Sequence, residues 1–132
     1  PEAEREEMAT TFRRLSVLFL LDVNRCTSPT LKAVQEIIGD TMNFDVERED
    51  IAKDVKQAQS ASPDIKKFFK TQTSGYADDG KFLLIITLRR ILETEGPLEE
   101  NERSRLLELG KIMGLRAKTV KEVLEADLDE AE

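Results

Sequence analysis

The stretch "KFLLIITLRRIL", residues 81–92, decides between an all-helical fold and a fold that contains a sheet. Its first eight residues are rich enough in β-branched side chains to form a buried strand. However, the apolar run continues without a break through "RRILE", and the chain has no second run with which such a strand could pair. A helix that is apolar on nearly all sides is typical of the centre of a helical domain. We therefore expect residues 81–93 to form a central helix, with Ile86 in the core.

Apolar residues at helical spacing also occur on both sides of this stretch, which predicts further helices. The stripes are Met8/Phe12/Leu15/Phe19, Leu31/Val34/Ile38/Met42, Val46/Ile51/Val55/Ala58, Leu106/Leu109/Met113 and Val120/Val123/Leu124. The segment "SPDIKKFFK", residues 62–70, adds a short helix with Ser62 as its N-cap and Pro63 at its first position. The sequence thus predicts an all-α single domain of about seven helices over residues 1–132.

The composition limits the classes of protein to which this chain can belong. Its 132 residues suit one domain, and the 39% that are apolar are enough for one core. The net charge is −7 and both ends are acidic, so nucleic-acid binding is not expected. The longest apolar run is far below the roughly 20 residues that span a bilayer, and no signal peptide is visible, so membrane contact is not expected either. Cys26 is the only cysteine, which excludes an intrachain disulfide and fits a cytoplasmic protein.

The two halves of the chain resemble each other when one is shifted by 71 residues. Phe12 then coincides with Leu83, and many other apolar positions coincide as well without a gap. Residue identity is low, but the apolar pattern is shared. The sequence therefore predicts two pseudo-repeated helical halves, at about residues 8–58 and 79–126.

The residues that start and stop helices follow the same shift. Ser28, a good N-cap before a proline, coincides with Glu99, which together with Glu102 forms a capping-box-like start. Asn43 coincides with Gly114, and these two residue types most readily adopt the left-handed conformation that ends a helix. The pattern therefore predicts the same order of elements in each half: a long helix, a short loop, a capped helix, a left-handed stop and a third helix.

Few kinds of site chemistry are open to this chain. It contains no histidine, which excludes His-based triads and histidine metal sites. It contains neither the GxxxxGK[ST] loop nor the GxGxxG loop, so no nucleotide cofactor is expected. In the apolar helix, Arg89 and Arg90 point about 100° apart, so at least one of them needs an internal carboxylate or covers apolar surface with its stem.

The acidic turn "ETEGPLEENE", residues 93–102, is the one candidate for a cation site. Glu95, Glu99 and Glu102 are weak candidate ligands for Ca²⁺ or Mg²⁺, which prefer carboxylates that converge in a turn. The spacing does not match an EF-hand loop, and Arg25 in the matching first loop would oppose a cation. We therefore expect mainly a turn with a capped helix start and at most loose divalent-cation binding.

The second half resembles the TerB-like family of small helical domains. In that family a helix ends in an Ala-Asp-Gly-like step, and a Glu follows seven residues after the Asp. Here Glu95-Gly96 stands at that step, Glu102 at the later Glu, and "RSRLLELGKIMGL" resembles the helix that follows. In the first loop, Asn24-Arg25 replaces the Asp-Gly step. The resemblance implies a two-half helical fold, at most half of a cation site, and a context of bacterial stress response or tellurite resistance.

The function that we expect from this resemblance is a non-enzymatic interaction module with a protein partner that the sequence does not identify. Two alternatives stay open. One is a small enzyme that uses carboxylates or a lysine, although no pair of residues stands out. The other is a purely structural homo-oligomer, and the sequence does not indicate the oligomeric state.

Overall fold

In the computed structural model, which describes residues 2–127, those residues form seven α-helices and no strand. The helices are α1 (Glu2–Asp22), α2 (Ser28–Met42), α3 (Arg48–Ala61), α4 (Ile65–Gln72), α5 (Asp78–Glu93), α6 (Glu100–Ile112) and α7 (Ala117–Glu125). The prediction of an all-α single domain is confirmed, and residues 81–93 belong to a helix rather than to a strand. Within the described range, no helix combines the length and the apolarity needed to cross a membrane.

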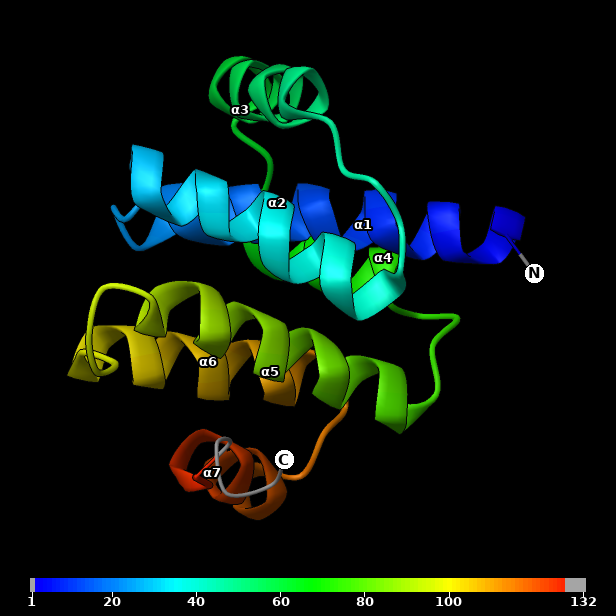
Figure 1. Cartoon of the computed structure of the whole chain (residues 1–132). Helices are drawn as coiled ribbons and strands as arrows, with labels where there is room; N and C mark the ends of the chain where they lie inside the picture. Colours follow the sequence, from blue (N-terminus) through cyan, green and yellow to red (C-terminus); the bar gives the residue numbers. More distant parts are fainter. Residues whose placement is uncertain (1, 128–132) are drawn as a thin grey trace.

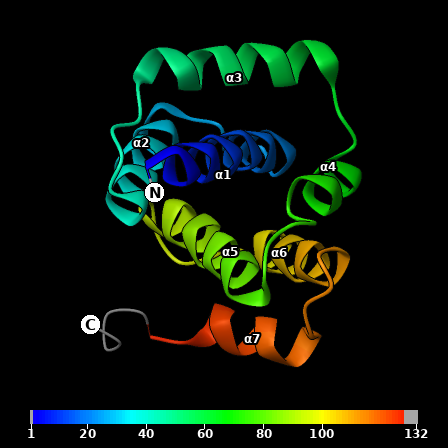
Figure 2. The same ribbon diagram turned by 90° about the vertical axis from the view of Figure 1, so that its right-hand side faces the viewer.

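The helices are stacked in layers (Figure 1). α1 and α2 lie side by side in one layer, and α5 and α6 lie side by side in a second. α3 crosses the outer side of the first layer and α7 crosses the outer side of the second, as the side view in Figure 2 shows. α4 packs against α1 and α6 and covers one side of the stack. The two outer helices therefore lie at opposite ends of the molecule.

α5 is the helix that joins the layers, because it packs against α1, α2, α6 and α7. The prediction that Ile86 lies in the core is wrong, since this residue is only half buried. It shares a stripe with Phe82 and Arg90, at steps of four residues, and this side of α5 partly faces solvent. The other sides carry the fully buried side chains Leu84, Ile85, Leu88 and Ile91.

Two helices start one or two residues away from the predicted caps. α2 is capped by Thr27 rather than Ser28, because the amide of Thr27 donates to Thr30 Oγ1 at 2.9 Å and Thr27 Oγ1 accepts from the amide of Thr30 at 3.4 Å. α4 is capped by Asp64, whose carboxylate accepts from two amides of the first turn. Ser62, the predicted cap of α4, instead ends α3 with a left-handed φ of 42°.

The predicted left-handed ends are confirmed. Asn43 ends α2 with φ 50°, and Gly114 follows α6 with φ 90°. In both places the next apolar residue donates its amide back across the turn, from Phe44 to Gly39 O at 3.0 Å and from Leu115 to Gly110 O at 2.9 Å. These bonds satisfy carbonyl groups that a helix end would otherwise leave without a partner.

The prediction for the arginine pair in α5 is confirmed for Arg89. Its side chain is 10% exposed, and Nε donates to Glu93 Oε1 at 2.9 Å. Nη1 donates to the carbonyl oxygen of Val123 at 2.7 Å, which ties α5 to α7. The guanidinium of Arg89 thus pairs with a carboxylate of its own helix and also holds α7.

Candidate functional site

The acidic turn between α5 and α6 does not bring its three candidate ligands to one point. The side chain of Glu102 is fully buried, and its Oε1 accepts the amide of Glu99 at 2.9 Å, as expected of a capping box. Glu99 itself is exposed at the start of α6. Glu95 points toward the other loop, where its Oε1 lies 3.3 Å from Thr27 Oγ1. Glu95 and Glu102 therefore each have a structural contact of their own, and Glu99 does not join them.

Arg25, from the loop between α1 and α2, contacts two of these carboxylates. Nη1 donates to Glu102 Oε2 at 2.7 Å, and Nη2 lies 3.4 Å from Glu95 Oε1. Burial opposes the charge of Arg25, but Glu102 and Glu95 together raise the pKa of its guanidinium above the ordinary value. A positive side chain of the protein thus contacts the carboxylates that a metal ion would use.

This pairing bears on the predicted cation site. Among residues 2–127, no group of three or more His, Cys, Asp or Glu side chains is placed to hold a metal ion. Ca²⁺ or Mg²⁺ binding by Glu95, Glu99 and Glu102 stays a prediction, and an ion there would have to compete with Arg25. Sequence reasoning missed the pair between Arg25 and Glu102, because the two residues lie 77 positions apart. The available signal was a cation in one loop and an excess of acids in the matching loop.

Cys26 lies next to Arg25 in the same loop. Its thiol is half buried, and burial raises the pKa of the thiol above the ordinary value. A raised pKa disfavours the thiolate, which is the reactive form. The observation agrees with a packing role for this cysteine.

A second ionic cluster joins α1, α4 and α6. Arg105 donates to both carboxylate oxygens of Asp22, at 2.6 and 2.8 Å, and also to Glu108. Lys66, from the basic α4, lies 3.3 Å from the same Glu108. Arg105 and then Lys66 lower the pKa of Glu108 below its ordinary range. This cluster and Arg25 both link the first half of the chain to the second.

α3 is attached to its layer less evenly than α7 is to its own. α7 packs against both helices of its layer, whereas α3 packs mainly on α1 and only weakly on α2. The apolar side chain that α3 buries is Ile51, and its ionic anchor is Asp54, 6% exposed, which accepts hydrogen bonds from Arg13 of α1. Clefts therefore remain on both sides of α3.

The larger cleft, here called the α2–α3 groove, has a volume of about 480 Å³. α2 and α3 both contribute side chains to its lining. The groove combines apolar and basic side chains, and none of the described residues that line it is acidic. Its lining is Ser28, Leu31, Lys32 and Gln35 from α2, with Arg48, Ile51 and Ala52 from α3.

The smaller cleft lies on the other side of α3, between α1, α3 and α4, and has a volume of about 180 Å³. Its apolar lining includes Leu18, Ala58, Pro63 and Phe68. This volume suits one large side chain rather than a whole ligand. Both faces of α3 thus offer partly apolar surface, which the sequence stripes alone did not reveal.

Comparisons of the chain with protein-family models, with curated proteins and with solved structures gave no match.

Proposed function

We propose that this protein is a non-enzymatic interaction module of TerB-like type that binds a protein partner through the surface around α3. The two helical halves serve as the scaffold. The TerB-like resemblance suggests a bacterial stress-response or tellurite-resistance complex as the setting. Divalent-cation binding at the acidic turn is at most a minor part of this proposal.

Helix punctuation supports the proposal of two pseudo-repeated halves. The left-handed ends at Asn43 and Gly114 lie 71 residues apart, as do the glycines Gly39 and Gly110 that accept the returning amides. α3 and α7 also take matching places on the outer sides of their layers (Figure 2). A scaffold of this kind presents one outer helix at each end.

The observation that carries the proposed function is the difference between the two outer helices. α7 closes over both helices of its layer, while α3 leaves a groove on one side and a cleft on the other. Grooves that mix apolar and polar groups between helices are common binding places for partner segments. These features support the surface around α3 as the place where a partner binds.

Affinity capture from an extract of the native host cells tests this proposal. Ala52→Arg puts a long charged side chain into the α2–α3 groove from an exposed position. Ala126→Arg makes the same change at an exposed position after α7 and serves as the matched control. Circular dichroism first verifies that both variants keep the helical fold.

We expect quantitative mass spectrometry to find at least one protein that the original protein and Ala126→Arg retain and Ala52→Arg loses. If all three proteins capture the same set in the same amounts, the surface around α3 is not the binding surface and the proposal is wrong.

A further inference from the structure

This inference rests on the proposed function and specifies the partner's chemistry. We propose that the α2–α3 groove binds a short acidic amphipathic helix, with apolar side chains against Leu31 and Ile51 and carboxylates against Lys32 and Arg48. Nothing in the sequence pattern or the resemblance assigns a ligand to this groove. The charge of the groove, its shape and the exposure of its cations favour such a ligand.

The charge of the groove is opposite to the charge of the protein. The chain has 27 acidic and 20 basic residues and a net charge of −7, yet the groove lining contains two cations and no described carboxylate. In an acidic protein, a carboxylate-free surface with two cations favours a negative partner over a positive one. Charge complementarity therefore selects an acidic ligand.

The two cations are available to a partner. Arg48 is exposed and makes no ion pair with any other residue in the described range. The side chain of Lys32 is 76% exposed, and its ion pair is a long one of 3.8 Å to Glu36, whose side chain is 61% exposed. Exposed pairs of this kind contribute little, so a partner carboxylate can replace Glu36 at small cost.

The lining of the groove supplies apolar contact. Leu31 of α2 is half buried and Ile51 of α3 is 4% exposed, so Leu31 offers a partner more apolar surface than Ile51 does. On α2 the lining residues recur at positions 28, 31, 32 and 35, which is one face of a helix. A partner helix laid along this face would contact both α2 and α3, and a volume of about 480 Å³ accommodates a few of its side chains.

The binding experiment uses defined peptides and fluorescence anisotropy. The probe is a labelled helical peptide of about 14 residues, roughly the length of α2, with Leu on one face and Glu on the other. Two further peptides keep the Leu face and replace every Glu with Gln or with Lys. The protein variants are Lys32→Glu, Arg48→Glu and their combination.

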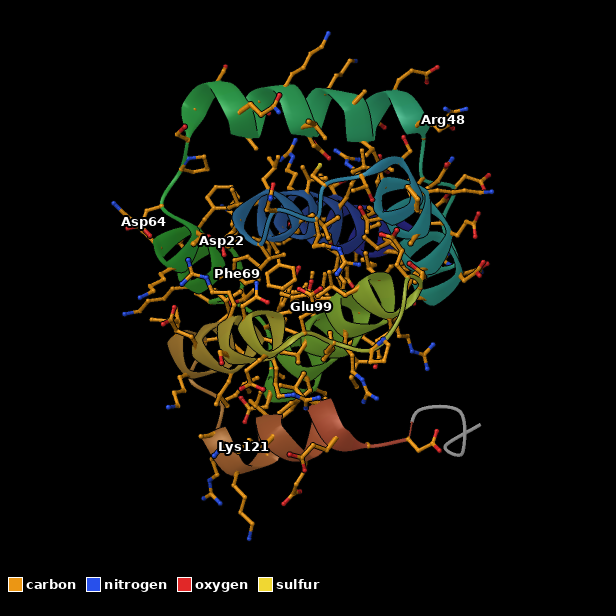
Figure 3. All side chains as sticks on the ribbon, turned by 90° about the vertical axis from the view of Figure 1, so that its left-hand side faces the viewer. Asp22, Arg48, Asp64, Phe69, Glu99 and Lys121 are labelled. Carbon is orange, nitrogen blue, oxygen red and sulfur yellow. The ribbon has the colours of Figure 1, made fainter. Side chains whose placement is uncertain are left out.

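Lys121→Glu is the matched control, because it makes the same charge change on exposed α7, at the opposite end of the molecule from Arg48 (Figure 3). We expect the acidic peptide to bind the original protein most tightly. Each groove variant should weaken it roughly twofold to fivefold, as expected for an exposed ion pair. The combined groove variant should instead prefer the Lys peptide, whereas Lys121→Glu should change neither preference.

Three results would overturn the inference. One is equal binding of the acidic and Gln peptides, and a second is equal weakening by Lys121→Glu and Arg48→Glu. The third is that the acidic peptide does not bind. In that case vesicles containing phosphatidylserine are tested as well, and binding of the vesicles that depends on Arg48 would mean that the groove binds a lipid surface instead of a helix. The capture experiment with Ala52→Arg has a separate outcome, so a wrong partner chemistry can be distinguished from a wrong binding surface.

Discussion

Arg25 supplies the positive partner of the buried carboxylate in the acidic turn. Its guanidinium reaches from the first half of the chain to the fully buried carboxylate of Glu102 in the second half. A buried carboxylate requires a partner, because removing an ion from water is costly. The same carboxylate also accepts the amide that starts α6. Glu102 therefore combines a local role with a long-range one.

Replacing Arg25 with Met should lower the free energy of unfolding by about 2–4 kcal/mol, because the buried Glu102 loses its positive partner. Arg25→Met combined with Glu102→Gln should be more stable than Arg25→Met alone, since glutamine is neutral and still suits the capping box. Urea unfolding of the full double-mutant cycle measures both effects. Arg116→Met, at an exposed position, is the control and should change stability by less than about 0.5 kcal/mol. Equal effects of Arg25→Met and Arg116→Met would contradict the ion-pair interpretation.

Glu108 predicts a pH dependence of stability. Arg105 and Lys66 lower its pKa in the folded protein, so its contribution is present above the ordinary carboxyl pKa of about 4.3 and is lost as the pH falls through the lowered value. Glu108→Gln should therefore melt below the original protein at about pH 7, and the difference should shrink as the pH falls below the ordinary carboxyl pKa. Thermal melts monitored by circular dichroism give the comparison. A difference that does not depend on pH would show that packing, not charge, is responsible.

At the scale of elements, Gly110 shows why two helices can approach closely. A Cβ atom at this position would lie 2.8 Å from Val120 Cγ2, so any larger residue would push α6 and α7 apart. Gly110→Ala should lower stability by about 1–2 kcal/mol, even though alanine favours a helix by about 1 kcal/mol. In Gly80→Ala, the new Cβ meets only ordinary contacts, the nearest at 3.4 Å, so this control should be neutral or stabilising. Chemical denaturation of both variants decides the matter, and a stable Gly110→Ala would refute the close approach.

The uneven attachment of α3, which packs mainly on α1, predicts a difference in hydrogen exchange. α3 buries Ile51 and Asp54, whereas the shorter α7 buries Val120 and Leu124 and is also held by the arginine of α5. Backbone amides in α3 should exchange faster than those in α7. Asp54→Asn should accelerate exchange in α3 without affecting α7. Exchange measured by mass spectrometry would contradict this account if α7 opened first.

The sequence predicted the helices well, because apolar stripes depend on local spacing. The left-handed ends were also predictable, since Asn43 and Gly114 act within their own turns. The predicted caps of α2 and α4 were misplaced, because Thr27 and Asp64 compete locally with Ser28 and Ser62 for the same role. The α2–α3 groove was not predictable, since it depends on how α3 sits on α1, and stripes do not encode that position.

At the scale of the molecule, the two halves share one core. α5 packs against helices of both halves, and the buried apolar residues form a single cluster. Ionic links from Arg25 and from Arg105 also cross between the halves. Neither half therefore has a complete core of its own.

This shared core predicts cooperative unfolding of the whole domain. Tyr76, the only tyrosine in a chain without tryptophan, lies between the halves with its ring centroid 6.2 Å from that of Phe12. Its fluorescence reports on the junction, whereas far-UV circular dichroism reports on all helices. The two signals should show the same midpoint in urea. Separate midpoints would mean that the halves unfold independently.

The half-buried thiol beside Arg25 has a kinetic consequence. Because the protein has a single cysteine, every modification event reports on one loop. That loop is held by the contact of Arg25 with Glu102, so we expect the half-buried thiol to become more exposed when the contact opens. The rate of thiol labelling should therefore report how often the two halves separate at this end. It would detect openings of the loop that are too brief to alter the average structure.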